Sequence, residues 1–246
     1  MKKLGFIAII IAMTTFCFAE KVTLATGEWS PFTSESLPEF GFASEIVKEA
    51  FNVQGIEVEF KFFPWKRCEA LVKNGEVLAT FPYKKTEKRS EKFIFSKSIL
   101  TTKNFFYYVK NGKDFQYEDL SDLQGYKIGG VLGYFYKPIF EKAGLNVEYS
   151  SKEVHCLKKL LAGRIDLYPG NQIPTWELIK NELPDQVDKF ATLPKPFLKG
   201  ENHLMFSKDN PMADKYIEIF NKGLKKIKDS GKYDKIVKKH GIKLTR

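Results

Sequence analysis

Short apolar stretches of two kinds alternate along the chain. Stretches typical of β-strands lie at 22–26, 56–63, 77–82, 126–132, 146–150 and 165–169. Stretches with apolar residues about 3.6 positions apart, typical of amphipathic helices, lie at 43–51, 66–74, 135–143 and 153–163. Because strands that alternate with helices favour parallel sheets with right-handed crossovers, the pattern predicts an α/β fold.

One arrangement occurs twice in the sequence. CEALVKNGEVLATFP (68–82) and CLKKLLAGRIDLYPG (156–170) each place a cysteine seven residues before a glycine, and a buried-type strand follows. The repeat predicts two similar lobes that share a helix–glycine–strand unit. Cys68 and Cys156 then hold equivalent places, and a disulfide between them would lock the lobes together. An exported chain can pair its cysteines, but two separate buried thiols are the favoured interpretation.

Two long strand-like segments, at 103–113 and 202–211, are predicted to connect the lobes. Two helical stretches follow the second connector and are expected to pack on the first lobe. Lobe 1 is therefore expected to comprise 20–107 plus 202–246, and lobe 2 to comprise 108–201. In two-lobed α/β proteins the ligand lies at the carboxyl ends of strands, which here are the facing edges of the lobes.

The N-terminal segment 1–19 has the layout of a cleavable secretory signal peptide. Two lysines precede an apolar stretch at 4–18, and Ala19 is suited to a cleavage point. The stretch is shorter than the roughly 20 residues that a membrane-spanning helix needs. Cys17 raises a lipoprotein signal as the alternative, but Phe16 stands where such a signal has a small residue. We expect a soluble protein exported to the periplasm.

The chain is basic, with 40 Lys and Arg against 30 Asp and Glu, and a net charge of +10. Loss of the two lysines of the signal peptide leaves +8. Such a surface suits acidic small molecules, cell-wall polymers or membrane surfaces, whereas export argues against nucleic acid as a partner. His155, His203 and His240 show no metal-ligand spacing, so no metal or cofactor is expected.

The most strongly charged segment is FPYKKTEKRSEKFIFS, at 81–96, which holds five cations within nine residues. Charge runs are usually solvated faces, so its four lysines are expected to lie in solvent. Arg89 differs from them because it completes a Thr-x-x-Arg pattern that begins at Thr86 and precedes a Phe-Ser pair. Thr86 can cap the short turn that holds Arg89.

The chain resembles the extracellular solute-binding proteins of family 3, the amino-acid-binding type that serves ABC transporters. The resemblance covers nearly the whole mature chain. Seven segments match the family in order: TGEWSPF, GFASEIVKEAF, PWKRCEALVKNG, KTEKRSEKFIFS, DLQGYKIGGVLG, LLAGRIDL and LKKIKDSGKYDKIVKKHG. The resemblance implies a two-lobed fold of the periplasmic-binding-protein type II kind. It also implies a monomer that closes on a small carboxylate-bearing ligand and delivers it to the membrane subunits of a permease.

The resemblance also implies roles for individual residues. Arg89 matches the arginine that receives the ligand's α-carboxylate, a role that suits the paired N–H donors of a guanidinium. Trp29 matches an aromatic residue that stacks on the ligand, and Trp65 matches a second aromatic wall. The alternatives are a surface charge for Arg89, core packing for Trp29 and a hydrophobic staple for Trp65.

In the second lobe, Gly133, Tyr134 and Phe135 match a turn whose backbone N–H groups can hold a carboxylate oxygen. Tyr134 and Phe135 stand where the family usually has threonines. In the first lobe, the segment 81–85, which includes Tyr83, replaces small hydroxyl residues. The site is therefore expected to be more aromatic than is usual in the family.

Two further positions change the expected ligand. Asn171 stands where the family usually has an aspartate for the ligand's α-ammonium group. Either another acid, such as Glu28, takes that role or the ligand lacks a free amine. Arg67 begins a helix that points at the cleft and can supply a second cation, although a surface salt bridge is the alternative.

Two other classes of function remain open from the sequence. A few relatives of this fold are periplasmic enzymes of small carboxylic acids, such as dehydratases, and His155 is the one candidate base for such chemistry. Sensor kinases also carry this domain, so a stand-alone sensory module is the third hypothesis. No paired carboxylates or nucleophile–base pair occur in the cleft segments, which favours a binding protein over an enzyme.

Overall fold

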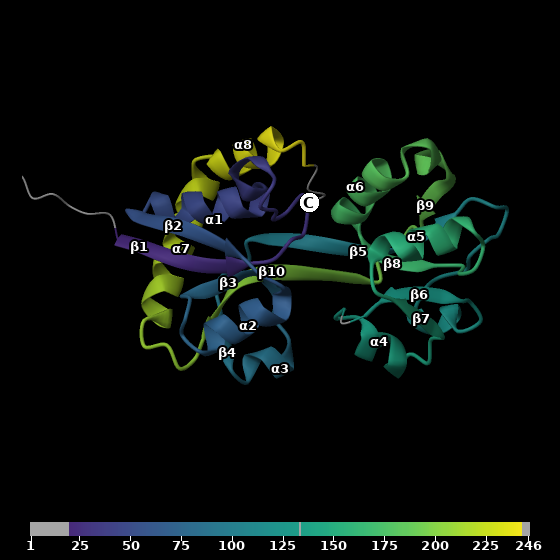
Figure 1. The fold of residues 1–246 in the computed structure, drawn as a ribbon, viewed down its shortest axis with the longest axis horizontal. Helices are drawn as coiled ribbons and strands as arrows, with labels where there is room; N and C mark the ends of the chain where they lie inside the picture. The colour runs from purple at the N-terminus through teal and green to yellow at the C-terminus, as the bar shows by residue number, and fades with distance from the viewer. Residues whose placement is uncertain (1–19, 133, 243–246) are drawn as a thin grey trace, which may run out of the picture.

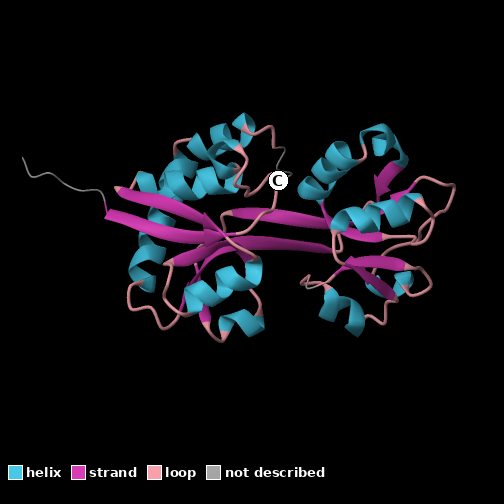
Figure 2. Ribbon diagram, viewed as in Figure 1, coloured by secondary structure: helices cyan, strands magenta, loops and turns pink. Residues whose placement is uncertain are grey.

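The chain folds into two lobes joined by two long strands (Figure 1). The computed structural model describes residues 20–132 and 134–242. The predicted signal peptide at 1–19 and Gly133 lie outside the described residues. Figure 2 shows strands running through the middle of both lobes, with helices on their outer faces. The predicted two-lobed α/β fold is therefore confirmed.

Lobe 1 is built around a sheet with β1 between β2 and β3, both parallel to it. A short strand, β4, pairs with β10. The strands are β1 (Glu20–Thr26), β2 (Ile56–Phe62), β3 (Ala79–Lys84) and β4 (Phe93–Phe95). The helices are η1 (Pro38–Phe40), α1 (Phe42–Asn52), α2 (Trp65–Lys73), α3 (Glu87–Ser90), α7 (Ala213–Asp229) and α8 (Lys232–Lys239).

The two connecting strands are β5 (Leu100–Val109) and β10 (Leu198–Ser207). They pair antiparallel from Leu198 opposite Asn104 to Asn202 opposite Leu100. β10 also pairs with β3 of lobe 1, and β5 pairs with β8 of lobe 2. One continuous sheet therefore crosses between the lobes. The predicted lobe boundaries, 107/108 and 201/202, fall within these strands and stay predictions.

Lobe 2 has a parallel pair, β6 and β7, beside the strands that continue the crossing sheet. Its strands are β6 (Ile128–Val131), β7 (Val147–Ser150), β8 (Tyr168–Asn171) and β9 (Phe190–Thr192). Its helices are η2 (Leu120–Leu123), α4 (Lys137–Lys142), α5 (Glu153–Leu161), α6 (Gln172–Glu182) and η3 (Pro184–Lys189). The strand predicted at 165–169 begins and ends later than expected, and α6 was not predicted.

Each lobe has its own aromatic-rich core. In lobe 1, Phe51 of α1 packs against Phe220 of α7 with ring centroids 5.4 Å apart. In lobe 2, the Phe106 and Phe140 rings stack 5.6 Å apart. Both pairs are fully buried, so each lobe removes large apolar surfaces from water independently of the other. Among the described helices, none combines the length and the apolar character that crossing a membrane requires.

The two cysteines have similar surroundings in the two lobes. Cys68 Sγ donates to the carbonyl of Thr26 at 3.2 Å, and Cys156 Sγ donates to the carbonyl of Gly130 at 3.3 Å. Cys68 thus links helix α2 to the end of β1, and Cys156 links helix α5 to β6. Both are buried and free, in agreement with two separate thiols.

Candidate functional site

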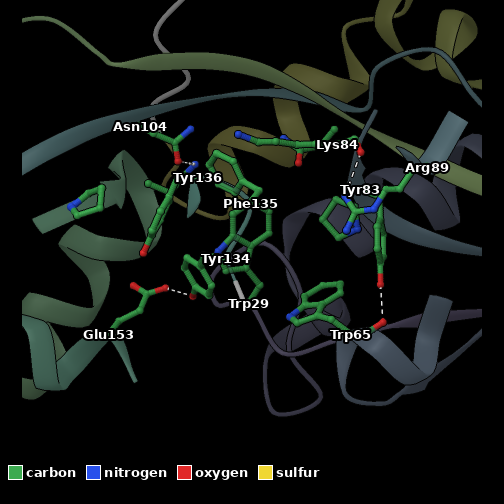
Figure 3. Close-up of a pocket in the computed structure, with 14 residues that line it drawn as sticks. Trp29, Trp65, Tyr83, Lys84, Arg89, Asn104, Tyr134, Phe135, Tyr136 and Glu153 are labelled. Atoms are coloured by element: carbon green, nitrogen blue, oxygen red, sulfur yellow. Dashed lines mark hydrogen bonds between the residues drawn. The ribbon is translucent and has the colours of Figure 1, made fainter. Parts of the chain in front are cut away.

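A cavity of about 200 Å³ lies between the lobes (Figure 3). Most of the residues predicted to form the site line it together: Trp29, Trp65, Tyr83, Arg89, Tyr134, Phe135 and Asn171. The structure does not bring Arg67 to this cavity. Its side chain is exposed, and its guanidinium lies 4.7 Å from the centroid of the Phe63 ring.

Arg89 is held in place by its own segment. Thr86 caps the short helix α3 by accepting a hydrogen bond from the Arg89 backbone N–H at 3.2 Å, as predicted. The Arg89 guanidinium donates to the Lys84 carbonyl at 3.1 Å and lies 4.6 Å from the centroid of the Tyr83 ring. Its Nε is 3.7 Å from Glu69, and its side chain is 28 % exposed. The guanidinium is thus oriented, yet it keeps N–H donors for a carboxylate.

Lobe 1 contributes flat aromatic walls to the cavity. The Tyr83 hydroxyl donates to the Trp65 carbonyl at 2.7 Å, and the two rings meet edge to face. A methyl group placed on Gly27 would lie only 2.6 Å from the Trp65 ring, so the glycine lets the indole lie against β1's end. Trp29 is half-buried and packs on Phe32 with centroids 4.3 Å apart. Both tryptophans therefore combine a packed side with a side that faces the cavity.

Lobe 2 contributes an acid that the sequence analysis did not identify. The Tyr134 hydroxyl donates to the carboxylate of Glu153 (Figure 3). Burial raises the pKa of Glu153, and the hydrogen bond from Tyr134 partly opposes that rise. Glu153 is the one carboxylate among the described residues that line this cavity. It was missed because an acid in the first turn of a helix is ordinary, and its interaction with the helix dipole explains it without a ligand.

Strands β5, β8 and β10 contribute amides to the cavity. Asn171 Nδ2 lies 3.5 Å from Asn104 Oδ1, and Asn202 Nδ2 donates to Thr102 at 3.1 Å. Asn171, Asn104 and Asn202 all line the cavity. Glu28, the acid considered as a replacement for the missing aspartate, lines a neighbouring hollow instead and accepts a hydrogen bond from a backbone N–H at 2.9 Å.

Lys84 also lines the cavity, whereas it was expected in solvent. β3 extends to Lys84, beyond the strand predicted at 77–82, and pairs there with Asn202 of β10. The side chain consequently enters the space between the lobes, where its Nζ lies 3.9 Å from the centroid of the Phe135 ring. Burial lowers the pKa of Lys84 to about 8. The cavity therefore holds two cations from lobe 1, Lys84 and Arg89.

The candidate base considered from the sequence does not lie at the cavity. His155 is exposed and does not line it; its Nδ1 lies 3.5 Å from the Ser151 hydroxyl. Asp166 accepts a hydrogen bond from the Lys127 N–H and pairs with Lys113, which is a structural role. Within 20–132 and 134–242, no group of His, Cys, Asp or Glu is arranged to hold a metal ion.

Comparisons with known proteins agree with this architecture. The model of the bacterial extracellular solute-binding proteins, family 3, matches residues 23–243. A probable histidine-binding protein of Campylobacter jejuni is 26 % identical over 205 residues, which are 82 % of this chain and 77 % of that protein. The L-cystine-binding protein TcyA of Bacillus subtilis is 25 % identical over 218 residues, 87 % of this chain and 78 % of that one. An ancestral arginine-binding protein, solved with arginine bound, superposes with a TM-score of 0.71 at 24 % identity, over 89 % of this chain and 97 % of that one.

Proposed function

The chain belongs to the bacterial extracellular solute-binding proteins of family 3, and we propose that its ligand is a small carboxylate-bearing solute, an amino acid or a related organic acid. The observation that carries this proposal is the position of Arg89, oriented at the edge of a cavity between two lobes. The names of its relatives, which bind histidine and cystine, support the same class of ligand. The ligand would then pass to the membrane subunits of an ABC-type permease.

The carboxylate is assigned to Arg89 on physical grounds. A guanidinium keeps its charge when it is removed from water, and it offers two parallel N–H donors that match a carboxylate. The Tyr83 ring lies against the guanidinium and Trp65 packs on Tyr83, so these rings would partly shield a bound carboxylate from water, which strengthens such a pair. The same rings suit the apolar part of the solute.

Closure of the lobes would be driven by the ligand. Residues of both lobes line the cavity, so a solute touches all of them only when the lobes approach one another. A ligand that binds the closed form more tightly shifts the population toward it by that difference in affinity. The antiparallel strands β5 and β10 carry this motion, since they are the backbone connection between the lobes.

The partner of a ligand amine is proposed to be Glu153. Asn171 offers an amide oxygen but no negative charge at the position where the family resemblance expects an aspartate. Glu153 lies across the cavity from Arg89 and is oriented by Tyr134. A bound ammonium group would favour the ionised form of Glu153 and lower its pKa again.

The protein is proposed to act without catalysis and as a monomer. The exposed His155, the candidate base, does not line the cavity, and Glu153 is the one carboxylate among the described residues that do. We also propose that the segment 1–19 directs export and is removed near Glu20, and that the lobes divide as 20–107 plus 202–246 and 108–201.

A thermal-shift screen of amino acids, dicarboxylates and aromatic acids tests the proposal. A ligand at 100 times its dissociation constant should add about 2.7 kcal/mol to the free energy of unfolding. Arg89→Ala should then weaken binding by about 2 to 5 kcal/mol, because a buried carboxylate loses its partner. Lys88→Ala, at an exposed position of the same helix, is the matched control. Unchanged affinity in Arg89→Ala would refute the carboxylate assignment.

A further inference from the structure

Lys84 occupies an unusual place for a lysine. Its Nζ atom is buried, and it has no hydrogen-bond partner among the described residues. No described carboxylate lies within 4.0 Å of it. A buried ammonium group without a hydrogen-bond or ion-pair partner costs free energy, because the face of the Phe135 ring, 3.9 Å from Nζ, replaces only part of its hydration. Such a group in a binding cavity calls for a partner that arrives from outside the chain.

The surroundings of Lys84 direct its side chain into the cavity. Its side chain lies alongside Gly200 of β10: a methyl group placed on Gly200 would be in ordinary van der Waals contact, 3.4 Å from Lys84 Nζ and 3.5 Å from its Cε. Phe135 of lobe 2 covers the ammonium from the other side. Because Phe135 belongs to the opposite lobe, separation of the lobes uncovers Lys84 and their approach encloses it together with whatever occupies the cavity.

Lys84 and Arg89 point in different directions (Figure 3). The Arg89 guanidinium turns toward Tyr83, whereas the Lys84 ammonium reaches toward Phe135. The Arg89 guanidinium contacts the backbone carbonyl of Lys84 and not its ammonium group. The two cationic groups therefore form two separate sites for anions. A ligand that binds both cations would need two anionic groups, one near Arg89 and one near Lys84.

We propose that Lys84 binds a second anionic group of the ligand, so that the solute is a small dicarboxylate. This inference rests on the proposed function, because it assumes that Arg89 receives the first carboxylate. Glu153 distinguishes two kinds of dicarboxylate: it suits the amine of an acidic amino acid and does nothing for a plain dicarboxylic acid. The aromatic walls accommodate the carbon chain or ring between the two carboxylates.

Isothermal titration calorimetry with isosteric pairs tests the inference. The pairs are L-glutamate and L-glutamine, L-aspartate and L-asparagine, glutarate and its monoamide, and succinate and its monoamide. Each pair differs by one negative charge and has nearly the same shape. We expect the dicarboxylate to bind at least about tenfold more tightly than its amide, which is about 1.4 kcal/mol.

Lys84→Met removes the charge and keeps the length of the side chain. It should abolish the preference for the dicarboxylate and leave the affinity for the monoamide within about twofold. It should also raise the melting temperature of the unliganded protein, because the buried unpaired charge is gone; loss of a merely structural residue would lower it. Lys85→Met, at the neighbouring exposed lysine, is the control and should change neither property.

The outcomes distinguish failure of this inference from failure of the proposed function. If monoamides bind as tightly as dicarboxylates, or Lys84→Met weakens both members of a pair equally, Lys84 does not recognise a second anion and the inference fails alone. If none of these solutes, nor histidine, cystine or arginine, binds at millimolar concentration, the proposed function fails and the inference fails with it.

Discussion

Raising the pH from 7 to 9 should weaken the binding of an amine-free dicarboxylate such as glutarate about tenfold. Burial lowers the pKa of Lys84 to about 8. The ammonium is then about nine-tenths charged at pH 7 and about one-tenth charged at pH 9. The carboxylates of glutarate stay ionised throughout, since ordinary carboxyl pKa values lie near 4. Affinity for the second anionic group should follow the charged fraction of Lys84.

The stability of the unliganded protein should change in the opposite direction. The pKa of Lys84 is lower in the folded state than in the unfolded state, so the unfolded chain binds more protons between pH 8 and 10.5. The free energy of unfolding therefore rises with pH through that window, and the full destabilising effect of the buried charge is present below it. One residue thus makes the empty protein more stable and the complex weaker as the pH increases.

Calorimetric titrations of glutarate at pH 7, 8 and 9 measure the first effect. Wild type should lose affinity over this range, whereas Lys84→Met should bind weakly with little dependence on pH. Lys85→Met should follow wild type, since its ammonium is exposed. The reasoning is refuted if wild-type affinity stays constant between pH 7 and 9, or if Lys84→Met keeps the same slope.

Three further predictions concern other parts of the molecule. Glu153→Gln should weaken an amine-bearing ligand at least about fivefold and spare its amine-free analogue, as titration of the matched pair would reveal; equal losses would contradict the role assigned to Glu153. Gly223→Ala should lower the free energy of unfolding, measured in urea, by about 1 to 3 kcal/mol, because the methyl would lie 1.8 Å from a carbonyl oxygen of α1. Gly125→Ala is the control and should change this free energy little, because Gly125 faces open space. Cys68 and Cys156 should resist alkylation until the protein unfolds, since burial raises the pKa of both thiols, and a peptide that links them in mass spectrometry would disprove separate thiols.

Much of the fold could be predicted from local patterns. The strands around β1 and the helices α1, α5 and α7 have apolar residues at the expected period, because one face of each is buried in its lobe. Helix α6, QIPTWELIKNE, was missed for a physical reason. It has a proline inside its first turn, and Pro174, Thr175 and Ile179 are its buried residues, so it shows no continuous apolar stripe.

Some of the cavity residues could be predicted from local patterns, and others could not. Arg89 was identifiable because its Thr-x-x-Arg pattern is local: Thr86 caps the helix that holds it. The position of Lys84 depends on the pairing of β3 with β10, a segment more than 100 residues later in the chain, and on Phe135 from the other lobe. A pattern of neighbouring charges carries no information about such contacts, so a buried lysine within a solvated run could not be distinguished from the exposed ones.

The chain crosses between the lobes twice, along β5 and along β10, so lobe 1 is built from the first and the last segments of the chain. The core of lobe 1 combines the early helix α1 with the late helix α7, where Phe51 meets Phe220. The core of lobe 2 uses one continuous stretch of chain that begins within β5 and ends before β10. As the chain emerges from the ribosome, lobe 2 can complete its core while lobe 1 still lacks α7. The part of α1 that packs on α7 therefore stays uncovered until synthesis is nearly finished.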